Sequence, residues 1–170
     1  MIFAAPSPND PIEQADIFDA CPIFGLDASD KSVDLNATPA RWQERVIVLT
    51  QACDLAQAKT TKVVVAVVHT AQTLVDRGIL KAQAIRDQIR RGQVYGWYFL
   101  PAAPAPIAFP ESIVDLRDRH TISRPVLERL AVDDKRVCRL QSPFREHLAQ
   151  HFAVTYMRIG LPAPFETAVD

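Results

Sequence analysis

Two apolar runs set the architecture of this chain: Arg45-Val-Ile-Val-Leu-Thr-Gln-Ala-Cys-Asp54 and Lys62-Val-Val-Val-Ala-Val-Val-His-Thr70. Both are rich in β-branched residues, a composition typical of buried β-strands. Each run ends abruptly in polar side chains, which are Thr50, Gln51, Cys53 and Asp54 after the first strand and His69 and Thr70 after the second. Polar groups held at the end of a rigid strand often form binding or catalytic sites. We therefore expect any chemistry of this protein at these strand ends.

Weaker patterns on both sides of these runs predict an α+β fold. We expect strands near residues 15–24, 45–51, 62–69, 94–100 and 111–122, and helices near residues 72–91 and 143–159. Gly78 interrupts the first helical segment, which is therefore either one kinked helix or two short ones. Residues 54–61 suit either a hairpin loop or a single helical turn. Outside residues 71–93, the connections are too short for the crossovers of a parallel sheet. The prediction is a small antiparallel, partly closed barrel with added helices.

The length of 170 residues predicts one domain spanning residues 1–170. Residues 1–13 contain three prolines and are expected to be a loose lead-in. The barrel is expected over residues 14–122, with a helical insertion near 71–93. A C-terminal helix is expected over 142–160, with Ser142 as N-cap, Pro143 as first helical residue and an apolar stripe facing the core.

Composition is that of an ordinary soluble globule, with 48% hydrophobic residues, 23% charged residues and a net charge of −1. The three cysteines are far apart, which predicts reduced thiols rather than a disulfide framework. The sequence has no apolar run of membrane-spanning length and no signal-peptide pattern at its start. We therefore expect a cytoplasmic protein without a membrane span.

Half of the 14 arginines fall in one stretch near the C-terminal end, namely Arg117, Arg119, Arg124, Arg129, Arg136, Arg139 and Arg145. A local basic face of this kind can bind nucleic acid even on a neutral protein. The same stretch holds acidic residues that could neutralise it, which are Asp115, Asp118, Glu128, Asp133 and Asp134. Both interpretations stay open at this point.

Several classes of site are disfavoured by spacing. Five scattered glycines form no phosphate-binding loop, and no pair of cysteines or histidines has the spacing of a zinc motif. We therefore expect no metal and no cofactor. His147 and His151 share one face of the C-terminal helix, because they lie four residues apart. We expect that face to be solvated.

The remaining polar residues suit metal-independent cleavage of RNA by its own 2′-hydroxyl. Arginine binds phosphate and stabilises its developing charge, histidine moves protons near neutral pH, and a hydroxyl can orient the substrate. We predict catalytic roles for Arg45, His69 and Thr70. We predict substrate contacts for a second set, which is Thr50, Gln51, Arg117, Arg119 and His120. The alternative is that all of these residues cap strands and form salt bridges.

Cys53 offers a different chemistry. A cysteine close to a histidine can be an activated thiolate, so Cys53 with His69 would form a thiol hydrolase. Free cysteine is also among the most buried residue types, and packing in the core explains Cys53 equally well.

The order of four segments resembles the MazF/PemK toxin family. Asp16-Ile-Phe18 is similar to a Gly-Asp-Ile/Val strand that opens the family fold. Residues 45–50 resemble its Arg-Pro-Val-Val-Val-Leu-Ser strand, residues 63–70 its Val-Ile-Val-Ala-Pro-Ile-Thr strand, and residues 112–127 its late strand. The chain departs from the family in having Ala15 in place of the opening glycine and no proline after Arg45.

This resemblance implies an SH3-like barrel and a metal-independent, homodimeric endoribonuclease that an antitoxin silences. It would place Arg45 at the scissile phosphate and Thr70 as the strand-end hydroxyl. The expected partners are single-stranded RNA, an antitoxin or other protein, and a second copy of the chain. Two functions therefore stay open: a MazF-like, RNA-directed toxin, and a non-catalytic MazF-like barrel that binds a protein partner in a bacterial stress or defence system.

Overall fold

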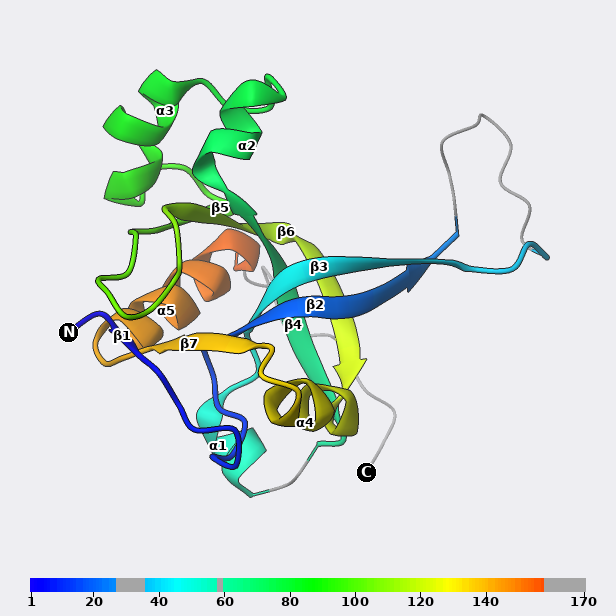
Figure 1. Cartoon of the computed structure of the whole chain (residues 1–170). Coiled ribbons are helices and arrows are strands. Elements are labelled where there is room, and N and C mark those ends of the chain that lie inside the picture. Colours follow the sequence, from blue (N-terminus) through cyan, green and yellow to red (C-terminus); the bar gives the residue numbers. More distant parts are fainter. Residues whose placement is uncertain (27–35, 58–59, 158–170) are drawn as a thin grey trace, which may run out of the picture.

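The computed structural model describes residues 1–26, 36–57 and 60–157 of the chain. In this part of the chain, one antiparallel sheet forms the centre of the molecule (Figure 1), and its strands run in the order β1-β7-β2-β3-β4-β6-β5. The strands are β1 (Phe3–Ala4), β2 (Asp16–Gly25), β3 (Ala40–Val48), β4 (Lys62–Thr70), β5 (Trp97–Leu100), β6 (Ser112–Ser123) and β7 (Arg136–Leu140). The predicted α+β class and antiparallel pairing are confirmed. The sheet is open, with β1 and β5 at its edges, so closure into a barrel is not confirmed.

The two apolar runs are confirmed as the central strands. β3 and β4 pair in register, with Val46 opposite Val67 and Val48 opposite Val65, and all four side chains are buried. β4 also pairs with β6 along its whole length, from Lys62 to Thr70. The β-branched side chains therefore fill the core on both faces of the sheet, as expected for strands buried on both sides.

The far parts of β2 and β3 form a two-stranded ribbon that projects from the body of the molecule (Figure 1). β2 pairs with β7 only from Asp16 to Phe18, whereas its pairing with β3 continues from Cys21 to Gly25. Beyond the body, each strand of the ribbon is thus paired only with the other. Phe24 and Trp42 on this ribbon are exposed.

The helical segment predicted over residues 72–91 is present, and of the two predicted forms, one kinked helix or two short ones, the second is confirmed. The segment forms α2 (Ala71–Asp76), α3 (Ala82–Asp87) and a single 3₁₀ turn, η1 (Ile89–Arg91). Gly78 ends the first helix because it adopts a φ of 68°, a left-handed conformation that glycine tolerates best. The three short helices pack on the β5–β6 edge of the sheet, where Leu74, Ile85 and Ile89 form a cluster with Trp97.

The other helices differ more modestly from expectation. The segment after β3, which suited either a hairpin loop or a single helical turn, contains one helical turn, α1 (Ala52–Ala56). A further helix, α4 (Arg124–Val132), directly follows β6, where no helix was predicted. The C-terminal helix α5 (Phe144–Tyr156) has Pro143 as its N-cap, so the predicted start, with Ser142 as N-cap and Pro143 as first helical residue, is wrong by one residue. Leu148 of α5 is buried in the main core cluster, as the apolar stripe predicted. The predicted end of this helix lies outside the described residues.

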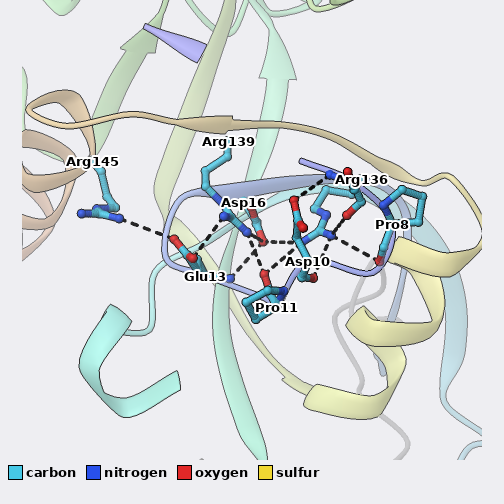
Figure 2. Close-up of polar contacts among 9 residues, drawn as sticks. Pro8, Asp10, Pro11, Glu13, Asp16, Arg136, Arg139 and Arg145 are labelled. Atoms are coloured by element: carbon cyan, nitrogen blue, oxygen red, sulfur yellow. Dashed lines mark hydrogen bonds and ion pairs between the residues drawn. The ribbon is translucent and has the colours of Figure 1, made fainter. Parts of the chain in front are cut away.

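Residues 1–13 are packed against the sheet, contrary to the expected loose lead-in. Phe3 of β1 pairs with Leu140 of β7, and Phe3 and Ile12 are buried. Figure 2 shows how the following loop is held: backbone carbonyls of this loop accept hydrogen bonds from Arg136 and Arg139 of β7. Proline has no backbone N–H but keeps its carbonyl acceptor, and the Pro11 carbonyl accepts from both guanidinium groups.

Asp16 lies at the centre of this arrangement and is completely buried. Its carboxylate accepts from Nη1 of Arg136 at 3.1 Å and from Nη2 of Arg139 at 3.0 Å. Glu13 adds a second carboxylate on Arg139 at 3.2 Å (Figure 2). We call Asp16, Glu13, Arg136 and Arg139 the Asp16 cluster. It joins the N-terminal loop to β2 and β7.

Candidate functional site

The predicted strand-end site is divided between two ends of the sheet. Because β3 and β4 are antiparallel, the end of β3 lies beside the start of β4, where the Thr50 hydroxyl accepts from the Val64 amide at 2.8 Å. His69 lies five residues further along β4, at about 16 Å from Val64 for an extended strand. The structure therefore brings Thr50, Gln51 and Cys53 together at one end and His69 and Thr70 at the other.

This separation argues against the thiol hydrolase built on Cys53 and His69. Cys53 is exposed on α1, so its expected packing in the core is also wrong. Its sulfur lies near its own neighbours, at 3.6 Å from the Gln51 amide oxygen. Cys21 and Cys138 are the buried thiols, and burial raises their pKa to about 11 and about 12 respectively. A pKa that high keeps a thiol protonated and unreactive at neutral pH.

Arg45 is already neutralised by an ion pair. Its guanidinium forms a two-pronged salt bridge with Asp19, in which Nη2 donates to Oδ2 at 2.9 Å, and it stacks 5.3 Å from the Phe109 ring centre. The hydrogen bond to Asp19 raises the pKa of Arg45, against the opposing effect of burial. In this structure, Arg45 would have to leave Asp19 before it could bind a phosphate fully.

The predicted contacts on β6 are also engaged. Arg117 pairs with Asp115 at 2.9 Å and stacks 4.1 Å from the Trp97 ring centre. Arg119 stacks 4.0 Å from the Tyr156 ring centre, and His120 bonds Asp118 at 2.9 Å. The ion-pair interpretation also describes the other arginines of this stretch, since carboxylates pair with Arg124, Arg129, Arg136, Arg139 and Arg145.

Thr70 has a different position, at the mouth of a groove of about 670 Å³. It is the last residue of β4 and the N-cap of α2, and its hydroxyl accepts from the Thr73 amide at 3.2 Å. The groove lies between the helical insertion, β5 and the residues before β6. Its polar and aromatic lining includes Thr70, Gln72, Arg86, Arg90, Phe99 and Glu111. We call it the insertion groove.

Arg86 and Arg90 make the insertion groove electropositive. Both are exposed, and neither has an ion-pair partner within residues 1–26, 36–57 and 60–157. Residues 71–93 carry five basic and two acidic side chains, an excess of three positive charges on a chain whose net charge is −1. Asp76, one of the two acids, accepts a hydrogen bond from Gln72 at 2.7 Å. The insertion is therefore a local source of positive potential beside the groove.

A second, smaller hollow of about 220 Å³ adjoins the insertion groove, because Arg90 and Phe99 line both. It lies between β5 and the start of α5, and Tyr98, Phe144 and His147 are among its lining residues. We call it the α5 pocket. Apolar side chains form the rest of its wall, including Leu100 and Leu140.

Both histidines of α5 were expected to be solvated, and this expectation is wrong for His151. His147 is exposed, and its Nδ1 lies 3.1 Å from the Tyr98 hydroxyl. His151 is 8% exposed, its ring centre lies 5.6 Å from that of Tyr98, and its Nε2 has no hydrogen-bond partner in the described structure. Burial lowers the pKa of His151, and the neighbouring His147 lowers it further. Burial raises the pKa of Tyr98 to about 12, so its hydroxyl stays protonated.

Comparison of the chain with protein-family models and with curated proteins gave no match. Within the described ranges, no group of three or more His, Cys, Asp or Glu side chains is arranged to hold a metal ion. The helices of the described residues are all too short or too polar to cross a membrane.

One residue of the predicted site, Thr70, lines the insertion groove, and the sequence analysis did not single out the arginines that line it too. It concentrated on the arginines after β5, because they are numerous. A usable signal was present, because residues 71–93 carry five basic and two acidic side chains. The balance of charge within each segment is more informative than the number of arginines.

Proposed function

We propose that this protein binds single-stranded RNA in the insertion groove, as a cytoplasmic, MazF-like protein with metal-independent endoribonuclease activity. The observation that carries the proposal is the presence of Arg86 and Arg90, both exposed and without carboxylate partners in the described chain, on the wall of a groove of about 670 Å³. Guanidinium groups without a counter-charge are suited to phosphate, which they bind through two parallel hydrogen bonds.

The lining of the groove favours a single strand over a duplex. Proteins that bind single strands combine a positively charged groove with aromatic rings on which free bases stack. Phe99 lines the groove together with the two arginines, and it is half-buried, so part of its ring is accessible. Bases in a duplex are stacked on one another and could not use such a ring.

The resemblance to the MazF/PemK family adds independent support. The four resembling segments fall mainly on β2, β3, β4 and β6, which are consecutive neighbours in the sheet. With that resemblance we propose an SH3-like core, a homodimer and an antitoxin-like protein partner. The cleavage step needs positive charge at the scissile phosphate, which Arg86 and Arg90 can supply without a metal.

The test is binding of fluorescein-labelled single-stranded RNA, followed by fluorescence anisotropy in EDTA, with the RNA then resolved on a gel. The double variant Arg86→Ala/Arg90→Ala should bind about 10-fold more weakly or worse, since it loses two phosphate contacts. The double variant Arg77→Ala/Arg91→Ala is the matched control: it removes the same charge from the same insertion, outside the groove. Wild-type protein that binds no single-stranded RNA would refute the proposal.

A second candidate function rests on the β2–β3 ribbon. Phe24 is 61% exposed and Trp42 40% exposed on a ribbon that extends away from the body of the molecule (Figure 1). Large exposed aromatic side chains are typical of protein interfaces. In this alternative the protein is a non-catalytic module that associates with a second copy through the ribbon. It predicts intact RNA, and a dimer in sedimentation experiments that Phe24→Ser/Trp42→Ser converts to a monomer.

A further inference from the structure

Two arginines line the insertion groove, but it has few groups that transfer protons. Among the residues that the structure describes, no histidine lines it, and Glu111 is the one carboxylate on its wall. Cleavage by the 2′-hydroxyl requires a group that removes a proton at the moment of attack, and histidine is the side chain best suited to this near neutral pH. A histidine, His147, lines the α5 pocket, which shares Arg90 with the insertion groove.

His147 is held there in a defined orientation. The Tyr98 hydroxyl lies 3.4 Å from the Phe144 carbonyl, to which it can donate, and 3.1 Å from Nδ1 of His147. A hydroxyl that donates to the carbonyl accepts from Nδ1–H, which leaves Nε2 of His147 as the unprotonated nitrogen. This tautomer is the one that a general base requires.

His151 lies beside His147 on the same helix and adds no positive charge to its surroundings. It lies one helical turn after His147, and the two ring centres are 6.4 Å apart. Because burial lowers the pKa of His151, its ring is neutral at neutral pH. The charged and titratable groups that surround His147 are therefore Arg90 of η1, Tyr98 of β5, and the neutral His151 and the Arg145–Glu146 pair of α5 itself.

We propose that the α5 pocket is the cleavage centre, in which His147 is the general base, Tyr98 is a positioning residue and Arg90 holds the scissile phosphate. This inference rests on the proposed binding of RNA in the adjoining groove. Arg90 lines both hollows, so a strand that follows the insertion groove would bring a phosphate to the edge of the pocket. The apolar wall of the pocket is suited to the base of the same nucleotide.

The reaction needs no co-reactant other than water. The ribose 2′-oxygen attacks phosphorus, and its proton passes to Nε2 of His147. The bond between phosphorus and the 5′-oxygen breaks, and the 5′-oxygen takes a proton from water. The products are a 2′,3′-cyclic phosphate and a 5′-hydroxyl end. His147 then releases its proton to solvent.

The test compares His147→Ala with Gln150→Ala, an exposed position of the same helix that lines neither hollow. We expect His147→Ala to cleave about 100-fold more slowly or worse while RNA affinity is unchanged, since loss of a general base costs about 100- to 10,000-fold. Gln150→Ala should cleave like the wild type. Tyr98→Phe should lower kcat without changing KM.

Two results separate this inference from the proposal on which it rests. If the wild type binds RNA but does not cleave it, or if His147→Ala cleaves at the wild-type rate, the α5 pocket is not a cleavage centre and RNA binding still stands. If the wild type binds no single-stranded RNA, the proposed function fails and the cleavage centre fails with it.

Discussion

Arginine is used in two opposite ways on the two sides of this molecule. In the Asp16 cluster, Arg136 and Arg139 are buried against a carboxylate and the carbonyls of the N-terminal loop (Figure 2). On the helical insertion, Arg86 and Arg90 are exposed beside a groove and have no carboxylate partner in the described structure. The first pair has its charge satisfied inside the protein, whereas the second pair can satisfy its charge only with a ligand or with water.

The difference shows that partners, and not residue type, distinguish a structural arginine from a binding one. A buried guanidinium without a carboxylate would be costly, so burial and pairing occur together. An exposed guanidinium loses little by having no partner, because water solvates it. Exposure without a partner beside a concave surface is therefore the combination that indicates a binding site. The following predictions test this distinction, from the largest expected effect to the smallest.

Replacing Asp16 should have the largest effect on stability. Asp16→Asn keeps the shape of the side chain but leaves two largely buried guanidinium groups without their shared carboxylate. We expect the free energy of unfolding to fall by about 3–5 kcal/mol, as measured by urea denaturation. Asp133→Asn is the control, because its ion pair with Arg129 is exposed and should contribute about 1 kcal/mol at most. Equal losses in the two variants would contradict the structural role of the Asp16 cluster.

His151 should make stability depend on pH. Its pKa in the folded protein lies below the ordinary value of 6.5, because of burial first and His147 second. The unfolded chain therefore binds the proton more readily, so stability is full above pH 6.5 and declines as the pH falls below that value. His151→Phe should remove this part of the decline, as measured by urea midpoints at two pH values. An unchanged decline in the variant would show that His151 is not its source. The effect should be smaller than that of Asp16→Asn.

Arg117 represents a third, intermediate class, since it is exposed but paired. Arg117→Ala loses its contacts with Asp115 and with the Trp97 ring, which at an exposed site should cost about 1 kcal/mol or less. Thermal denaturation should register this small loss. RNA affinity should not change, because the guanidinium already has a carboxylate partner. A clear loss of affinity in this variant would break the distinction between paired and unpaired arginines.

Much of the sheet could be predicted because its strands carry their own pattern. The β-branched runs of β3 and β4 are buried on both faces, so their composition alone was enough to predict them as strands. The insertion was harder, since Gly78 divides an apolar periodicity that continues across α2 and α3. α4 was not predicted, and residues 124–127 were compared with the family's late strand, although Pro125 lies in the first turn of a helix, where proline is tolerated.

The site was less predictable than the fold because it depends on contacts that are distant in sequence. Asp16 is 120 residues from Arg136, and Asp19 is 26 residues from Arg45. These pairs decide which arginines are free, and spacing along the chain gives no sign of them. Thr70 was identified because a strand end is a local feature. Arg86 and Arg90 became candidates only when the groove and the missing carboxylates were visible together.

The salt dependence of RNA binding tests the central claim most directly. Each phosphate contact to a single strand contributes about −0.7 to the log–log slope of affinity against salt concentration. Fluorescence anisotropy should therefore show a slope that is flatter by about 1.4 in Arg86→Ala/Arg90→Ala than in the wild type. Arg77→Ala/Arg91→Ala should keep the wild-type slope. Equal flattening in both double variants, or affinity that does not depend on salt, would contradict the assignment of the insertion groove as the RNA site.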